Sequence, residues 1–199
     1  PNANVIAPPW QLVTHEFGHA SFWHEHEHAY ACVNPLETGL CSVSGAMLWD
    51  RGDNIGLMGN GYGHVNAGLK MAAGWLTPGG VYKAQTVTTT GDYFIQPFES
   101  GNPGVKALQV VLFNRKFPTY FVLEYRQPIG FDANIGVFYL DADNVWNGLT
   151  IHSVVYNANG AVQSTTLLAM LPREQNNIRQ PSLPVGQTWC DPQLNNKLA

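Results

Sequence analysis

A Thr-Pro-Gly-Gly segment at residues 77–80 divides the 199-residue chain into two parts with different hydrophobic periodicity. Because proline cannot continue a helix and glycine commonly ends one, no regular element is expected to cross this segment. Before it, apolar residues recur near a 3.6-residue period and predict helices over 10–23 and 64–75. After it, segments rich in β-branched and aromatic residues predict strands at 81–87, 92–98, 105–113, 119–126, 136–142, 150–156 and 164–171.

The predicted fold class is therefore α+β, with a helical segment at 1–78 and a β-sandwich at 81–199. Seven short strands separated by turn clusters such as SGNPG (100–104) are typical of an antiparallel sandwich. The stretch 32–63 is rich in glycine and is expected to form turns.

The pattern HExxH appears as HEFGH at 15–19, on the first predicted helix. Histidines four apart lie on one helix face, so His15 and His19 can both reach one metal ion. Glu16 then lies beside the ion, where its carboxylate can take a proton from a zinc-bound water and deliver it to a leaving amine. Imidazole ligands and an open position for water indicate one catalytic Zn²⁺.

A catalytic zinc needs a third protein ligand, and the spacing after HEFGH is irregular. In the extended pattern HExxHxxGxxH, the last histidine lies six residues after the second one. Here that position holds Glu25, and the glycine position holds Phe22. His24 comes one residue early and His26 one residue late, so His24, Glu25 and His26 are all candidates.

His26 is the preferred third ligand, with His24 close behind. No glycine occurs between His19 and Gly39, so a loose return of the chain to His26 is easier than a tight one to His24. The fragment FWHEH resembles the astacin-like form of the motif, which favours His24. His28 is interpreted as a solvated bystander.

A glycine-rich segment, RGDNIGLMGN at 51–60, places Met58 directly before Gly59. A methionine in a tight turn beneath a zinc site is typical of metzincin peptidases, where it forms an apolar floor under the histidines. Tyr62 follows four residues later, and a tyrosine near this turn can donate a hydrogen bond to a developing oxyanion. The alternative for Tyr62 is a packing role.

Three segments together, HEFGH, GDNIGLMGN and HVNAGLKMAAGWL, resemble the gametolysin family of zinc peptidases, which is related to immune inhibitor A-type peptidases. Two later segments, YFVLEYRQPIGFD (120–132) and LPVGQTWCDP (183–192), are similar as well, so the resemblance covers 10–192. It implies that 1–78 is the C-terminal part of a metzincin-like catalytic domain, with an active-site helix, a Met-turn and a second helix.

The resemblance also implies a partner chain. Metzincins have a sheet before the active-site helix whose edge strand pairs with extended substrate, and fourteen residues precede His15 here. The chain also begins at Pro1 rather than Met, which is typical of a processed product. We therefore expect a separate N-terminal chain of the same precursor. Cys32 and Cys41 are spaced for a local disulfide, which leaves Cys190 to link such a chain or to stay free.

Two further groups of polar residues have simpler interpretations. Asp141, Asp143 and Asn144 offer oxygen ligands for a structural Ca²⁺, although a polar turn that closes a strand is the simpler explanation. Glu124 and Arg126 flank Tyr125 on a predicted strand, and we expect a same-face ion pair at the sheet edge or at an interdomain contact.

Composition limits the remaining classes. The net charge is −4 and no Lys/Arg run occurs, which argues against nucleic-acid binding, and no apolar stretch approaches the length that crosses a bilayer. Charged residues make up only 12% of the chain, a mix common in secreted proteins. The sequence thus predicts a secreted zinc endopeptidase acting on protein or peptide. The alternative is a non-catalytic, lectin-like or toxin-like binding module on a decayed peptidase scaffold.

Overall fold

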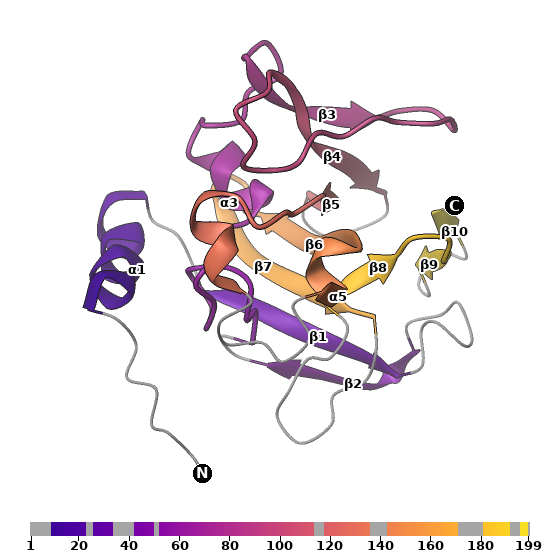
Figure 1. Cartoon of the computed structure of the whole chain (residues 1–199). Coiled ribbons are helices and arrows are strands. Elements are labelled where there is room, and N and C mark those ends of the chain that lie inside the picture. Colours follow the sequence, from indigo (N-terminus) through magenta and orange to yellow (C-terminus); the bar gives the residue numbers. More distant parts are fainter. Residues whose placement is uncertain are drawn as a thin grey trace.

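Eight strands form one mixed sheet in the structure, a computed structural model (Figure 1). The structure describes residues 9–22, 26–33, 42–49, 52–113, 118–135, 143–170, 181–191 and 196–198. Helices and mixed strands together make this an α+β fold, as predicted. The strands of the main sheet are β1 (Glu27–Val33), β2 (Ser42–Trp49), β3 (Tyr82–Val87), β4 (Gly104–Leu112), β5 (Thr119–Glu124), β6 (Gly148–Tyr156), β7 (Val162–Ala169) and β8 (Ser182–Pro184).

The main sheet is open rather than a sandwich, so the predicted antiparallel β-sandwich is wrong. Its strand order is β2-β1-β7-β6-β5-β4-β3, with β8 paired to the start of β6. The pairs β1–β7 and β3–β4 are parallel and the other pairs are antiparallel. A separate hairpin-like pair is formed by β9 (Trp189–Asp191) and β10 (Asn196–Leu198).

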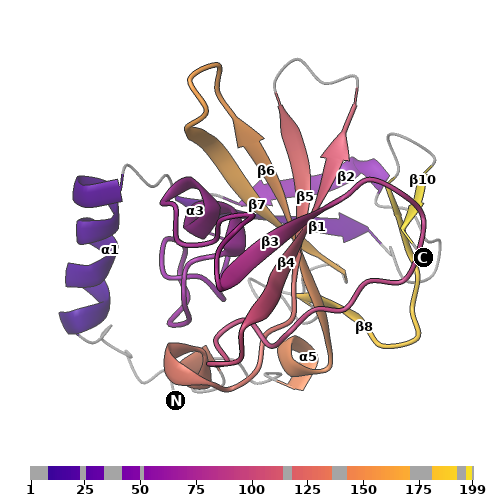
Figure 2. The same cartoon turned by 90° about the horizontal axis from the view of Figure 1, so that it is seen from above.

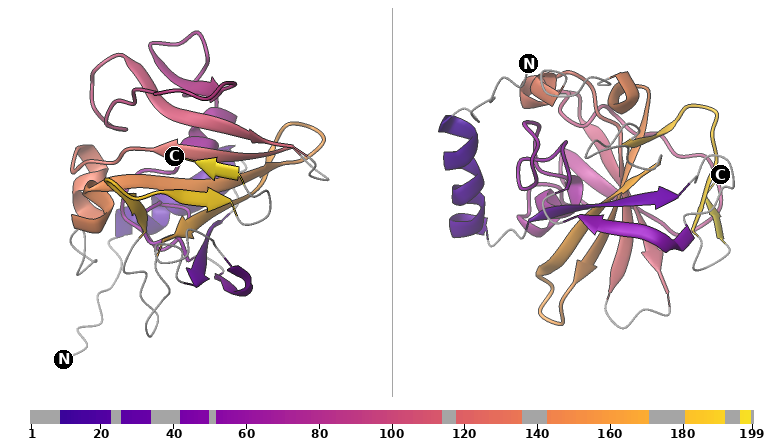
Figure 3. Two further views of the ribbon diagram at one scale, coloured as in Figure 1. Left: turned by 90° about the vertical axis from the view of Figure 1, so that its right-hand side faces the viewer. Right: turned by 90° about the horizontal axis from the view of Figure 1, so that it is seen from below.

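The sheet crosses the predicted boundary between 1–78 and 81–199. Strands β1 and β2 come from the first segment, and β1 pairs in parallel with β7 from the second. In the view from below, the purple β1 and β2 lie in front of the orange strands of the second segment (Figure 3). Neither strand was predicted, because their sequences lie in or beside the glycine-rich stretch. Of the expected strands, 92–98 is irregular, and 136–142 lies outside the described residues.

Helix α1 (Pro9–Phe22) confirms the helix predicted over 10–23. Proline suits the first helical position, where its missing N–H is not needed. The helix stands beside the sheet rather than on it (Figure 2). Four of its large apolar side chains are exposed, at 40% for Trp10, 59% for Leu12, 67% for Val13 and 56% for Phe17.

Helix α3 (Ala67–Ala72) is shorter than the predicted 64–75 and lies against the sheet. It begins at Asn66, whose side chain accepts a hydrogen bond from the Leu69 amide, and Gly74 follows its end at φ 75°. A Cβ at Gly68 would lie 2.6 Å from a methyl carbon of Val154, so glycine lets the helix approach β6 closely.

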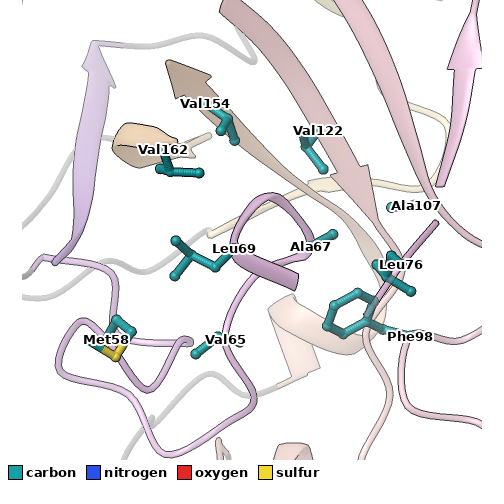
Figure 4. Packing of buried hydrophobic residues seen from close by; sticks show 10 residues of the cluster. All are labelled: Met58, Val65, Ala67, Leu69, Leu76, Phe98, Ala107, Val122, Val154 and Val162. Atoms are coloured by element: carbon teal, nitrogen blue, oxygen red, sulfur yellow. The ribbon is translucent and has the colours of Figure 1, made fainter. Parts of the chain in front are cut away.

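Buried side chains cover both faces of the sheet. On the α3 face, Met58 and α3 pack against Ala107, Val122 and Val154 of the strands (Figure 4). The opposite face buries Leu108, Phe121, Leu123, Ile151 and Trp189. Alternate residues of β4, β5 and β6 therefore point into two different cores, as period-two patterning requires.

Two short helices complete the described elements, η1 (Gly130–Asn134) and α5 (Asp143–Trp146). Asp143 and Asn144 begin α5, whereas Asp141 lies outside the described residues, so the calcium site stays a prediction. The predicted Cys32–Cys41 disulfide and the thiol of Cys190 also lie outside the described part of the structure. None of the helices in the described ranges has the length and apolar character needed to cross a bilayer.

Candidate metal centre

Three imidazoles meet at the C-terminal half of α1. His15 and His19 project from the same face of the helix, and His26 immediately precedes β1. The Nε2 atom of His19 lies 3.2 Å from Nε2 of His15 and 3.1 Å from Nε2 of His26. Among the described side chains, these three are the group of His, Cys, Asp and Glu whose ligand atoms are spaced for a metal ion.

A backbone carbonyl orients the first imidazole. Nδ1 of His15 lies 2.8 Å from the carbonyl oxygen of Leu57, and a carbonyl accepts only, so Nδ1 carries the proton. The other ring nitrogen of His15, Nε2, faces His19 and His26. This arrangement, in which one ring nitrogen donates to a carbonyl while the other faces the site, is the usual orientation of a metal-binding histidine.

The donor atoms fit a zinc ion. Two nitrogen ligands at tetrahedral angles and ordinary Zn–N distances are separated by about 3.3 Å. The two observed separations, 3.2 and 3.1 Å, lie close to this value. Hydrogen bonds alone account poorly for both contacts, since one ring nitrogen is either a donor or an acceptor and not both. A shared cation would accept a lone pair from each of the three imidazoles.

The structure describes two of the other predicted site residues, Glu16 and Tyr62. His24 and Glu25 lie outside the described residues. Glu16 is exposed on α1, about 100° around the helix from His15 and about 60° from His19. Tyr62 is 8% exposed and packs edge-on against Trp10, with ring centroids 6.3 Å apart. Burial raises the pKa of Tyr62.

The loop that carries Met58 is held by two buried carboxylates. Met58 is fully buried, and its amide donates to Oε2 of Glu27 at 3.0 Å. Oδ1 of Asp53 accepts hydrogen bonds from the amides of Ile55 and Gly56 at 2.8 and 3.1 Å. These contacts fix the loop backbone, and with it the Leu57 carbonyl that meets His15.

Behind this loop lies a buried chain of charges. Oδ2 of Asp53 is 2.8 Å from Nε2 of His152, whose Nδ1 is 3.0 Å from Glu124. Arg126 then pairs with Glu124 at 3.2 Å and with Asp132 at 3.0 Å. All five residues are fully buried in the chain (0% exposed).

The predicted ion pair of Glu124 and Arg126 exists. Of its two expected positions, the sheet edge is wrong. The pair lies where the predicted segments 1–78 and 81–199 meet, because Arg126 donates to the His64 carbonyl and Glu124 accepts from the Ala67 amide. Strand β5 pairs with β4 on one side and β6 on the other, so Glu124 lies inside the sheet. The role of Asp53 and His152 was not predicted. They are separated by 99 residues, and a single histidine on a strand carries no local signal of a distant carboxylate.

Mutual stabilisation shifts the pKa values of these groups. Burial alone lowers the pKa of His152, but the hydrogen bonds to Asp53 and Glu124 outweigh it and raise that pKa to about 10. Burial opposes the charged forms of Asp53 and Glu124, yet His152 lowers the pKa of Asp53, and Arg126 with His152 lowers the pKa of Glu124. His152 is therefore an imidazolium between two carboxylates at neutral pH.

Stability should fall at alkaline pH through His152. Its folded pKa of about 10 lies above the ordinary 6.5, so its contribution is complete below pH 6.5 and is lost as pH rises through 10. The slope in this window is at most about 1.4 kcal/mol per pH unit. Urea unfolding of the wild type and His152→Gln at pH 7, 8 and 9 measures it. The stability difference between the two should shrink as pH rises; a constant difference contradicts the assignment.

A cavity of about 490 Å³ separates the middle of α1 from the rest of the chain. Thr14, Phe17 and Gly18 line one side, and Met58 and Phe131 are among the residues that line the other. The helix is attached at its start, where the Trp10 ring stacks on Phe131 at 5.7 Å, and at its histidines. The cavity lies on the helix face next to the histidine face.

Comparison of the chain with protein-family models, with curated proteins and with solved structures found no match.

Proposed function

We propose that this chain is the zinc-binding, catalytic segment of a secreted endopeptidase of the metzincin type. The observation that carries the proposal is the convergence of His15, His19 and His26, with Nε2 atoms 3.1 and 3.2 Å apart across His19. Two further observations support the proposal. The Leu57 carbonyl orients His15, and the next residue, Met58, is fully buried. Proteins of the gametolysin type are the relatives that the sequence motifs suggest.

The division of chemical roles follows from the side chains. When bound, zinc supplies a Lewis acid that polarises the scissile carbonyl and makes water more acidic. His15, His19 and His26 hold the ion. The carboxylate of Glu16 accepts the proton of the attacking water and returns it to the leaving amine. Tyr62 is proposed to donate a hydrogen bond to the developing oxyanion.

A partner over α1 is part of the proposal. Leu12, Val13 and Phe17 are each more than half exposed, and apolar side chains grouped on one helix usually mark a contact surface. The proposed occupant is a separate N-terminal chain of the same precursor, which would also provide an edge strand for extended substrate.

Chelator-sensitive proteolysis tests the function directly. The purified chain, alone and with its proposed partner, is expected to hydrolyse casein, to lose this activity in a chelator and to regain it with added zinc. Zinc bound at one equivalent without hydrolysis in either form would instead support the non-catalytic binding module. Failure to bind zinc at all would refute the metal centre.

Substitution of His26 should separate the candidate third ligands. His26→Ala is expected to weaken zinc binding by more than about 100-fold, because a first ligand contributes more than the 10- to 100-fold typical of an outer partner. The matched His24→Ala should stay within a few-fold of the wild type. Competition with a chromogenic chelator measures both affinities. The reverse result would make His24 the ligand.

A further inference from the structure

Resting on the proposed zinc site, we propose that Glu27 is a positioning residue of that site. Its buried carboxylate locks the backbone next to His26 onto the loop whose Leu57 carbonyl orients His15. The hydrogen bonds of Glu27, here called the joint, would then position two of the three ligands, His15 and His26. Glu27 itself holds no metal in this proposal, since both of its oxygens are engaged by backbone amides.

The joint consists of four hydrogen bonds made by one residue. The side chain of Glu27 is fully buried; its Oε2 accepts from the Met58 amide at 3.0 Å and its Oε1 from the Asn66 amide at 2.8 Å. Its own amide donates to the Met58 carbonyl at 3.0 Å, and its carbonyl accepts from the Asp53 amide at 3.3 Å. Glu27 thus ties β1 to the Met58 loop and to the start of α3.

The joint is adjacent to both ligands. His26 precedes Glu27 in the chain, and Leu57 precedes Met58, so each is one residue from the Glu27–Met58 contact. A displacement of that contact would carry the His26 ring and the Leu57 carbonyl in different directions. The Nε2 atoms of His15 and His26 would then no longer point at the same metal position. Zinc affinity would fall, because zinc–nitrogen bonds are short and directional.

The loop is built to receive this carboxylate. A Cβ at Gly56 would lie 1.7 Å from Oε2 of Glu27, so the absence of a side chain there leaves the space that the carboxylate fills. Two acceptor oxygens facing two amides also explain the residue type. A glutamine of the same size would turn its NH₂ group toward one of the amides, which leaves a buried donor without an acceptor.

The experiment compares Glu27→Gln with Asp132→Asn in the full-length chain. Asp132 is the matched control, because it is also a buried carboxylate that accepts from a backbone amide, that of His64, but it lies at Arg126 rather than at the Met58 loop. Zinc affinity is measured by chelator competition and ligand geometry by the visible absorption bands of the Co²⁺-loaded protein. Both are recorded well below the unfolding temperature of each variant.

Glu27→Gln is expected to weaken zinc binding by about 10- to 100-fold and to change the Co²⁺ spectrum, as is typical for loss of a group that orients ligands. Asp132→Asn should lower the unfolding temperature while keeping the wild-type affinity and spectrum. Wild-type affinity and spectrum in Glu27→Gln overturn the proposal. If that variant does not fold, the same readouts on Glu27→Asp, which keeps the carboxyl group but shortens the reach, decide with the same criterion.

The two proposals fail in different ways. If the wild type binds no zinc, or binds it equally well without His15 and His19, the proposed function is wrong. If the wild type binds zinc through these histidines and Glu27→Gln binds it equally well, only the positioning role of Glu27 is wrong.

Discussion

Replacement of Glu16 by glutamine is expected to lower kcat for peptide hydrolysis by about 10²- to 10⁴-fold, the usual contribution of a general acid–base group. Glutamine has the same shape but cannot accept a proton from water at neutral pH. Glu16 is exposed on α1 and contributes no ligand to the histidine cluster, so zinc affinity should stay at the wild-type value. Steady-state hydrolysis of a quenched fluorescent peptide and zinc titration measure the two effects.

Asp92→Asn is the matched control for this experiment, because it removes one negative charge from an exposed position. It should leave both kcat and zinc affinity unchanged, which separates the role of Glu16 from an effect of net charge. Retention of more than about a tenth of the wild-type kcat in Glu16→Gln would remove Glu16 from the mechanism.

Replacement of Arg126 by leucine should cost about 3–5 kcal/mol of unfolding free energy, because it leaves buried carboxylates without a counter-charge. The guanidinium pairs with Glu124 and Asp132, donates to the His64 carbonyl at 2.9 Å, and lies 4.7 Å from the centre of the Phe98 ring. A loss of this size is comparable with the whole stability of a marginal domain. Urea unfolding followed by circular dichroism measures it.

The double variant Arg126→Leu/Asp132→Asn provides the internal test. Burial raises the pKa of Asp132 to about 6 despite the attraction of Arg126, so this carboxylate is costly to keep charged. Once Arg126 is gone, removing that charge should restore part of the lost stability, since an uncompensated buried charge causes most of the loss. Additive destabilisation in the double variant would show that lost packing of the arginine side chain dominates.

Local periodicity predicted those parts of the fold that depend on neighbouring residues. The helix over 10–23 appears as α1, and five of the predicted strands appear within a few residues as β3, β4, β5, β6 and β7. These elements satisfy their patterns with residues close in sequence: a 3.6-residue period for a helix and alternation for strands. The pairing of His15 and His19 in HEFGH is likewise local, because two residues four apart on a helix share a face whatever the rest of the chain does.

Local periodicity did not predict which distant strands pair with each other. Strand β1 joins β7 across more than 130 residues of chain, and its parallel alignment replaces the predicted sandwich by one open sheet. Strand order depends on which edges meet after the chain has folded, and a strand sequence does not specify its neighbour. The same is true of Asp53 and His152, whose 2.8 Å contact joins a loop to a strand.

The sequence alone therefore determined the candidate chemistry of this protein: two histidines one helical turn apart, a glutamate beside them, and a methionine loop to follow. It left the third ligand open among His24, Glu25 and His26, since a shift of one residue along an irregular loop moves a side chain by several ångströms. Only the tertiary structure placed Nε2 of His26 at 3.1 Å from Nε2 of His19, and the Leu57 carbonyl oxygen at 2.8 Å from Nδ1 of His15. The loop that carries Leu57 donates buried hydrogen bonds to Glu27 and Asp53, and these form only when distant segments are packed together and shielded from water.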